Sequence, residues 1–233
     1  MIERILPPGV AVSEAFDDPP DTALFPEEAL LVRNAVDQRR REFATVRMCA
    51  RRALAALGVP PVPVLPGRHG APRWPDAVVG SLTHCAGYRA AALAEAAHIA
   101  MLGIDAEPHG PLPDGVLDAI ALPRERSHLR DLRAAEPRVC WDRLLFSMKE
   151  SVYKAWNPFT GRRLGFEDAE MRLDPAAGTF TARLLVRHPL PDGGHLDRLD
   201  GRWLVRDGLA LTAIAVHASR LATTPERFPV PAE

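Results

Sequence analysis

The feature that most constrains the fold is an order of elements that occurs twice: a long helical segment and then several short strand-like runs. Residues 27–58 follow Pro26, which suits a first helical position, and end at Gly58, a helix stop signal. Residues 138–157 predict a second long helix, in which Trp141, Leu145 and Met148 recur at spacings of four and three; Pro158 is expected to end it. This order predicts an α+β protein.

Short apolar runs, separated by turn residues, precede or follow each long helix in the sequence. One group comprises Val10–Ala15, Val78–Cys85, Tyr88–Ala94 and His98–Asp105, of which the last three are expected to form one antiparallel meander. The other comprises Ala169–Leu173, Thr179–Arg187, Arg202–Val205 and Leu209–Val216, after shorter helices at 114–121 and 123–134. We therefore predict two similar α+β subdomains related by a pseudo-twofold, each a small antiparallel sheet packed on a long helix, although no sequence repeat accompanies them. The predicted boundaries are 1–106 for the first subdomain, 107–113 for a linker, 114–220 for the second subdomain and 221–233 for a flexible tail.

Composition restricts the class of protein. Of 233 residues, 47% are hydrophobic and 25% are charged, which is typical of a globular chain. The 29 basic and 30 acidic residues nearly cancel, so a nucleic-acid partner is not expected. No apolar run has the length of a membrane span and no secretory signal is visible, so we expect a cytoplasmic protein without a membrane partner. The three cysteines show no metal spacing and are expected to be reduced thiols. A cleft between two subdomains of one chain needs no second copy, so a monomer is expected.

Only two of the 29 basic residues are lysines, Lys149 and Lys154, and both lie on the second long helix. Lysine is a compact charge whose pKa can fall, whereas arginine is a planar fork that stays charged. On this helix Glu150 and Lys154 are four residues apart, so they share a face, and that face is away from the Trp141 stripe. The pair is either a surface ion pair on a solvated face or part of a charged site.

A second candidate is the strand end that carries Asp105 and Glu107. Strand alternation places both carboxylates on one face, where they repel each other unless a cation lies between them. Carboxylate oxygens suit Mg²⁺, although a polar strand end in water has the same pattern. If the helix that carries Glu150 packs against this strand, three carboxylates are available for one ion, with Lys149 and Lys154 beside them for phosphates.

Three further segments can contribute polar groups. His84 lies at the end of a strand that also carries Ser81. It either donates a hydrogen bond to a phosphate or is a core histidine whose hydrogen bonds are made within the protein. A serine-hydrolase role for Ser81 is disfavoured because the G-x-S-x-G pattern is missing. The arginine-rich helix, with Arg39 and Arg47, is either a binding face or a solvated one. The loop at 65–72 has glycines that let backbone amides approach a nucleotide.

Four motifs together carry a family resemblance. They are R-x-x-x-x-x-R-x-C-A from Arg41 to Ala50, G-S-L-T-H-C from Gly80 to Cys85, G-I-D-A-E from Gly103 to Glu107, and F-S-M-K-E-S-V-Y-K-A-W from Phe146 to Trp156. Across residues 36–217 the chain resembles the 4′-phosphopantetheinyl transferases of the surfactin-synthetase-activating type, near the enterobactin synthase component D branch.

This resemblance implies a reaction and roles for single residues. The family transfers the phosphopantetheine arm of coenzyme A, its co-substrate, to a serine of an apo acyl or peptidyl carrier protein and releases adenosine 3′,5′-bisphosphate. Mg²⁺, for which Mn²⁺ can substitute, would be held by Asp105, Glu107 and Glu150. Glu150, Lys154 and Asp105 would be catalytic, with Glu150 as the base and Lys154 assisting the leaving group. The residues expected to bind coenzyme A are Arg39, Arg47, Gly67, Arg68, His69, Ser81, His84, Asp105, Lys149 and Lys154.

Two other functions fit parts of the pattern. A Mg²⁺-dependent nucleotide pyrophosphohydrolase would explain the carboxylates but not a protein partner. A non-catalytic module that binds coenzyme A or an acyl carrier would explain binding without chemistry. For the transferase, an acidic helical carrier is expected to dock near the cleft, with arginines and apolar residues of the region 108–135 as candidates.

Overall fold

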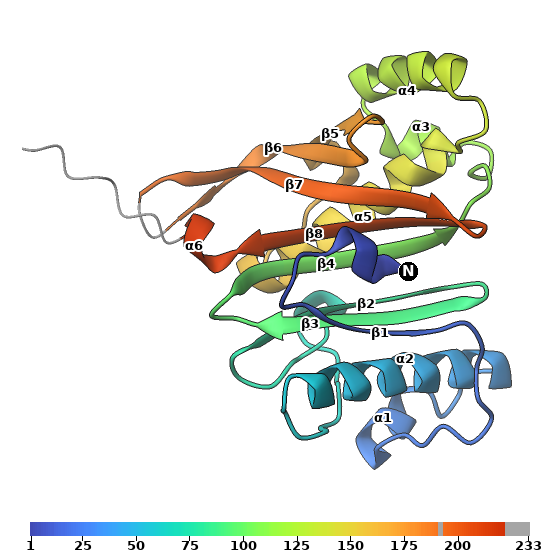
Figure 1. Cartoon of the computed structure of the whole chain (residues 1–233), viewed down its shortest axis with the longest axis vertical. Coiled ribbons are helices and arrows are strands. Elements are labelled where there is room, and N and C mark those ends of the chain that lie inside the picture. Colours follow the sequence, from blue (N-terminus) through green and yellow to red (C-terminus); the bar gives the residue numbers. More distant parts are fainter. Residues whose placement is uncertain (191–192, 222–233) are drawn as a thin grey trace, which may run out of the picture.

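Two antiparallel sheets, each covered by one long helix, make up the computed structural model, which describes residues 1–190 and 193–221 (Figure 1). The first sheet has the order β1 (Ala11–Ala15), β3 (Tyr88–Glu95), β2 (Val78–Cys85) and packs on α2 (Asp37–Ala56). The second has the order β4 (Ile99–Pro108), β8 (Leu209–His217), β7 (His195–Arg206), β6 (Thr179–Pro189), β5 (Ala169–Asp174) and packs on α5 (Trp141–Thr160). The predicted α+β class, with two sheets and two long helices, is confirmed. Apart from its first residue, the tail predicted at 221–233 lies outside the described residues.

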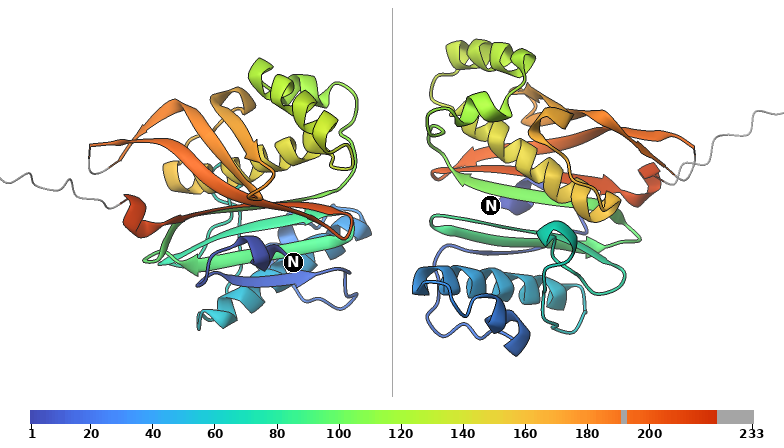
Figure 2. Two further views of the ribbon diagram at one scale, coloured as in Figure 1. Left: turned by 45° about the horizontal axis from the view of Figure 1, so that its top comes forward. Right: turned by 180° about the vertical axis from the view of Figure 1, so that it is seen from behind.

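Shorter helices precede each long one. Helix α1 (Pro26–Leu31) precedes α2, while α3 (Val116–Ile120) and α4 (Pro123–Ala135) precede α5. Three 3₁₀ turns, η1 (Ile2–Ile5), η2 (Arg68–Gly70) and η3 (Phe166–Asp168), and the terminal α6 (Ala218–Leu221) complete the described elements. Seen from behind, α2 and α5 both face the viewer, with η2 between them (Figure 2, right). Among the described residues no helix is both long enough and apolar enough to cross a membrane.

Strand β4 does not pair as predicted. The expected meander of three strands consists only of β2 and β3, because β4 pairs antiparallel with β8 instead. The edge of β4 that faces β2 is joined to it by side chains: Ser81 Oγ accepts a hydrogen bond from the Ile104 amide at 3.0 Å, and Thr83 Oγ1 accepts one from Ala106, also at 3.0 Å. The seam between the two sheets is therefore closed by hydroxyl groups rather than by a backbone ladder. The domain boundary at 106 stays a prediction.

The first predicted helix is two helices. The chain leaves α1 after Leu31 and begins α2 at Asp37, with a turn in which the Ala35 amide donates to the Val32 carbonyl at 3.0 Å. Leu31 and Val36 are exposed, while Val32 is buried. This break has no glycine or proline to mark it, and helical periodicity continues across it, so the sequence pattern alone does not show it.

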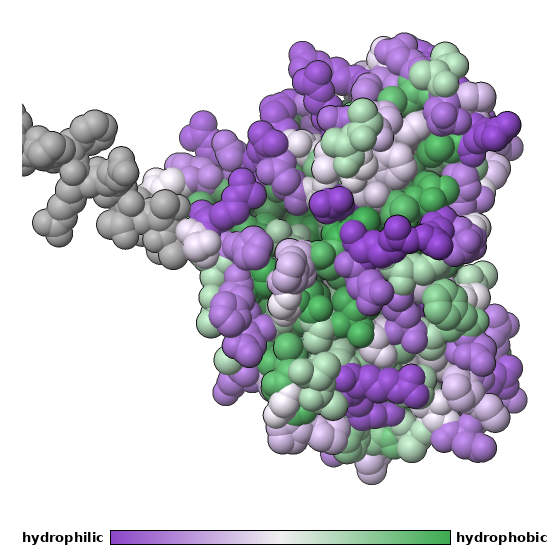
Figure 3. Space-filling model, in the orientation of Figure 1, coloured by the Kyte–Doolittle hydropathy of each residue, from purple (hydrophilic) through white to green (hydrophobic). Residues whose placement is uncertain are grey.

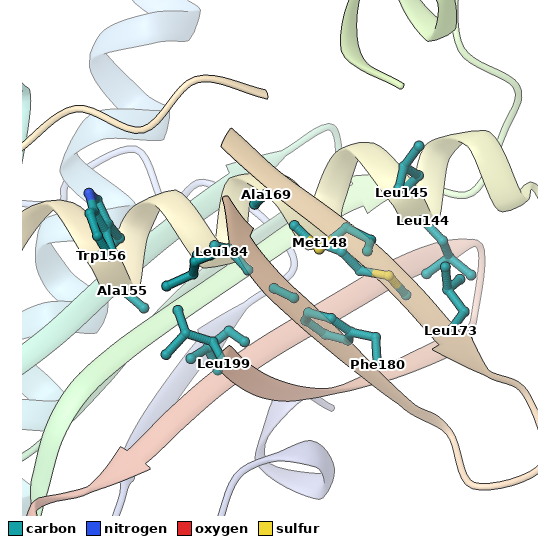
Figure 4. Packing of buried hydrophobic residues seen from close by; sticks show 14 of the residues in the cluster. Leu144, Leu145, Met148, Ala155, Trp156, Ala169, Leu173, Phe180, Leu184 and Leu199 are labelled. Carbon is teal, nitrogen blue, oxygen red and sulfur yellow. The ribbon is translucent and has the colours of Figure 1, made fainter. Parts of the chain in front are cut away.

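The second long helix extends beyond its predicted end. Pro158 lies inside α5, which continues to Thr160 and ends at Gly161 in the left-handed conformation (φ 65°). Because proline has no N–H, Pro158 cannot donate to the Lys154 carbonyl, so the last turn of α5 has one backbone hydrogen bond fewer. The buried face of α5 supplies Leu144, Leu145 and Met148 to a core that also contains Leu173 and Phe180 from the covering strands (Figure 4).

Helix α5 lies unusually close to β4 at Gly103. A Cβ atom built on Gly103 would lie 2.0 Å from the Ser151 carbonyl oxygen and 2.7 Å from the Ala155 amide nitrogen. Only glycine therefore permits this approach. The contact fixes the turn of α5 that carries Glu150 and Lys154 against the strand that carries Asp105.

The opposite face of the molecule is covered by the N-terminal turn. Ile2 and Ile5 of η1 are buried against Tyr88, Leu211 and Ala213, and so seal the region where the two sheets meet. In the space-filling view of this face, hydrophobic residues gather in the middle and hydrophilic residues surround them (Figure 3). The charged site described below lies between α2, β2 and α5.

Candidate active site

A cavity of about 430 Å³ lies between the two halves of the chain. Its walls come from α2, the loop around η2, strand β2 and the C-terminal half of α5. Seven of the residues predicted as site residues line it: Arg39, Arg47, His69, Ser81, His84, Glu150 and Lys154. The fold thus brings residues more than 100 positions apart to one place.

Asp105 of β4 and Lys154 of α5 form an ion pair at the edge of this cavity. The Lys154 ammonium donates to Asp105 Oδ1 at 2.6 Å, and Asp105 is only 4% exposed. The other oxygen, Oδ2, is buried and has no hydrogen-bond partner among the described residues. A buried carboxylate oxygen without a partner is costly, so this atom is available for a ligand or a cation.

The two other acidic residues lie in the field of Asp105. Burial and the charge of Asp105 raise the pKa of Glu150, and the same two causes raise the pKa of Glu107. Mutual repulsion of this kind is what a divalent cation relieves. The chemistry of the donors, together with the unpartnered Asp105 Oδ2, therefore fits Mg²⁺.

The carboxylates are nevertheless not gathered as a finished metal cluster. Within residues 1–190 and 193–221, no group of three or more histidine, cysteine, aspartate or glutamate side chains is close enough to hold a metal. Glu107 is turned to Arg143, whose Nη1 donates to its Oε2 at 2.9 Å. The assignment of Asp105, Glu107 and Glu150 as metal ligands stays a prediction.

The opposite wall of the cavity is positively charged. Arg39 Nη1 donates to His84 Nε2 at 2.6 Å, so this nitrogen of His84 carries no proton. Burial and the Arg39 charge lower the pKa of His84. Burial also lowers the pKa of Arg47 to about 10, although its guanidinium lies over the Phe43 ring, 4.1 Å from the centroid. Cations held in a half-buried site without full counter-charge favour an anionic ligand.

Comparison with known proteins shows the family. Residues 27–94 match the model of the 4′-phosphopantetheinyl transferase N-terminal domain, and residues 101–198 match that of the 4′-phosphopantetheinyl transferase superfamily. The 4′-phosphopantetheinyl transferase Svp of Streptomyces mobaraensis is 60% identical, covering 94% of this chain and 90% of that protein. The chain belongs to the 4′-phosphopantetheinyl transferase family. It is accordingly an enzyme of this class, as predicted.

Other relatives place the chain within this transferase family. The transferase Npt of Nocardia iowensis is 51% identical over 92% of this chain and 99% of its own length. PptT of Mycobacterium tuberculosis is 49% identical over 93% and 98%. Enterobactin synthase component D of Salmonella typhi is 31% identical over 59% of each chain, so the similarity to that branch is more distant than to these actinobacterial transferases.

Four residues predicted to bind the coenzyme do not line the cavity, namely Asp105, Lys149, Gly67 and Arg68. Lys149 is buried, and its ammonium donates to the Phe166 and Ala169 carbonyls at 2.7 and 2.9 Å and lies 3.0 Å from Glu125 Oε1. These oxygens occupy the donors that a phosphate would need, so the geometry does not support the predicted phosphate contact. Gly67 and Arg68 flank the cavity without lining it, whereas His69 lines it and accepts a hydrogen bond from Arg163 at 3.2 Å.

Sequence reasoning missed several residues of the site. Tyr153 and Asn157 line the cavity from the same helix face as Glu150 and Lys154, and each lies three residues after one of them, which was a usable signal. Phe43 also lines it, although its apolar character suggested only core packing. Arg143 had no signal, because its partner Glu107 lies 36 positions earlier.

Proposed function

We propose that this chain catalyses Mg²⁺-dependent transfer of the 4′-phosphopantetheine arm of coenzyme A to a serine of an apo acyl or peptidyl carrier protein, with release of adenosine 3′,5′-bisphosphate. The observation that carries the proposal is the charge arrangement of the cavity. One wall carries Arg39, Arg47 and His84, and the other carries Glu150 and Lys154 beside buried Asp105. Such a cavity suits a ligand with phosphates at two places, as coenzyme A has.

The positive wall would bind the 3′-phosphate. Arg47 and Arg39 supply hydrogen-bond donors in a fixed fork. His84 gains a proton more readily once an anion lies beside it, because the anion offsets the Arg39 charge that lowers its pKa. Ser81, which accepts the Ile104 amide, can turn its hydroxyl hydrogen toward the cavity.

The negative wall would hold the metal and the reacting groups. Asp105 and Glu150, with Glu107 after release from Arg143, would hold Mg²⁺, which when bound polarises the pyrophosphate and offsets its charge. Glu150 accepts the proton of the carrier serine, directly or through a water molecule. Lys154 stabilises or protonates the departing bisphosphate, a role in which arginine is deficient because it cannot release a proton.

The protein partner would be an acidic helical carrier, and α4 offers complementary charge. Arg126, Arg130 and Arg133 of this helix border a hollow that also contains Trp141 at the start of α5. Opposite charges across an interface accelerate encounter and fix orientation. The three arginines lie within the region 108–135 that the sequence suggested.

Intact-mass analysis tests the proposal. The protein is incubated with coenzyme A, Mg²⁺ and several purified apo carrier proteins, and the mass of each carrier is measured. A gain of one phosphopantetheine group, lost when the acceptor serine is replaced by alanine, is the expected result. Release of bisphosphate at the same rate with and without a carrier would instead indicate the pyrophosphohydrolase.

A further inference from the structure

Two buried glutamates occupy equivalent places in the two halves of the chain. Glu28 follows Phe25 and Pro26 at the start of α1, and Glu125 follows Leu122 and Pro123 at the start of α4. Each is the third residue of a helix that begins with proline, and they are 0% and 2% exposed. Each lies on the helix that precedes the long helix, and in both halves a short connection separates the two helices. These matching positions indicate duplication at the level of single residues, although the sequence shows no repeat.

The hydrogen bonds of Glu28 connect three segments of the first half. Its Oε2 accepts the Phe25 amide at 3.1 Å and Arg51 Nη1 at 3.2 Å, and its Oε1 accepts the Val64 amide at 2.9 Å. Arg47 Nε lies 3.7 Å from Oε1, within ion-pair range but without a hydrogen bond. Glu28 therefore lies beside Nε of the Arg47 guanidinium, and Arg47 lines the cavity.

The hydrogen bonds of Glu125 repeat this plan in the second half. Its Oε2 accepts the Leu122 amide at 2.7 Å, and its Oε1 accepts the Met171 amide, also at 2.7 Å. Its cation is Lys149, 3.0 Å away, whose ammonium also donates to the Phe166 and Ala169 carbonyls. Lys149 directly precedes Glu150, so this network fastens the turn of α5 that bears the base.

The two networks differ in whether their cation is available to a ligand. Lys149 has three oxygen partners and is fully used inside the protein. Arg47 has no hydrogen bond at Nε and stands in the cavity wall. The first glutamate therefore serves a side chain that meets the ligand, and the second serves the backbone of the helix that carries out the chemistry.

We propose that Glu28 and Glu125 are paired positioning residues with separate tasks: Glu28 orients Arg47 for the coenzyme phosphate, and Glu125, through Lys149, sets the position of Glu150. The inference rests on the proposed function for its ligand and its reaction. A merely structural role for both glutamates would instead weaken binding and turnover together.

The glutamates serve as controls for each other in the test. Glu28→Gln and Glu125→Gln are compared in steady-state transfer to an apo carrier, with coenzyme A varied. Glu28→Gln is expected to raise KM for coenzyme A about tenfold and leave kcat within about twofold. Glu125→Gln is expected to lower kcat about tenfold or more and leave that KM within about twofold.

Variants on the other side of each network keep the test decisive if a glutamate variant does not fold. Arg47→Met should repeat the KM effect, and Lys149→Met should repeat the kcat effect. Arg51→Gln is the matched control for the first network, since Arg51 shares Glu28 but does not line the cavity, and it should leave coenzyme A affinity unchanged. A network in which neither variant folds is structural, and the proposal fails for it.

Two binding measurements separate failure of this inference from failure of the proposed function. Calorimetry with coenzyme A in EDTA, without a carrier, should show weaker binding for Glu28→Gln and unchanged binding for Glu125→Gln. The Mg²⁺ concentration that half-saturates a thermal shift should rise for Glu125→Gln only. These results stand even if the wild-type protein modifies no carrier tested. Equal loss of both affinities in both variants would overturn the division of tasks.

Discussion

Replacing Gly103 by alanine tests whether the contact between β4 and α5 sets the reaction geometry. The new Cβ would lie 2.0 Å from the Ser151 carbonyl oxygen, whereas such contacts are essentially never shorter than 3.0 Å. The helix must therefore move away by about 1 Å, because both colliding atoms, the Ser151 oxygen and the Ala155 amide nitrogen, belong to its backbone. That shift is enough to break the 2.6 Å contact between Lys154 and Asp105.

The size of the effect follows from this displacement. Overpacking of a core contact costs about 1–3 kcal/mol, which corresponds to a fall in Tm of about 2–12 °C for a chain of this size. A misplacement of about 1 Å in a catalytic group reduces the rate about 100-fold. Because Arg39 and Arg47, which we propose bind the coenzyme, lie on α2, the KM for coenzyme A should change far less than kcat.

The assay combines thermal unfolding with kcat and KM measured by intact-mass analysis of the carrier. Gly110→Ala is the matched control, since a Cβ at Gly110 meets nothing within 4 Å and its backbone needs no left-handed conformation. The control should keep wild-type Tm and rates. A Gly103→Ala enzyme with wild-type kcat and Tm would refute the reasoning that this contact positions Glu150 and Lys154.

Three further predictions concern charges in the cavity. Lys154→Arg should lower kcat at least about tenfold but leave the Kd for coenzyme A, measured by calorimetry, nearly unchanged, and equal losses of both would leave only a charge role. His84 has a folded pKa below its unfolded value of 6.5, so the unfolded chain takes up a proton first as the pH falls and stability is lost below that value; Tm between pH 7 and 5.5 should thus fall less in His84→Gln than in wild type. Mg²⁺ at about 100 times its Kd should raise Tm by about 5–10 °C. The rise should vanish in Asp105→Asn, and persistence there would place the ion elsewhere.

Local pattern was enough to predict the elements near the site but not their partners. The stripe of Trp141, Leu145 and Met148 predicted α5 because packing against a sheet requires an apolar face. Alternation along residues 99–107 placed Asp105 and Glu107 together on one strand. The pairing of β4 with β8 was not predictable, because more than 100 residues separate the two strands and both candidate partners of β4 are apolar strands.

The predicted site residue that faces away from the cavity and those that were missed share one cause: their surroundings depend on a contact distant in sequence. Lys149 carries the same charge as Lys154 and lies five residues away, yet it turns inward because Glu125 and two carbonyl groups meet it there. Glu28 resembled an ordinary helix-start glutamate, and only the fold shows that it lies beneath Arg47 and Arg51. Periodicity assigns a residue to a face of its helix, whereas the neighbour on that face is a property of the tertiary structure.

The seam between the sheets explains why the site lies where it does. A continuous backbone ladder between β2 and β4 would join the two halves into one sheet and use the amide groups of both edges. Here the hydroxyl groups of Ser81 and Thr83 replace that ladder and hold β4 against β2. Asp105 therefore lies between Thr83 and Lys154. Each half can then supply one wall of the cavity, a cationic one from α2 and an acidic one from β4 and α5. Thr83→Val should therefore reduce activity more than its effect on Tm explains, because it frees the strand that carries Asp105; a loss of activity no larger than that of an equally destabilised variant elsewhere in the core would contradict this account.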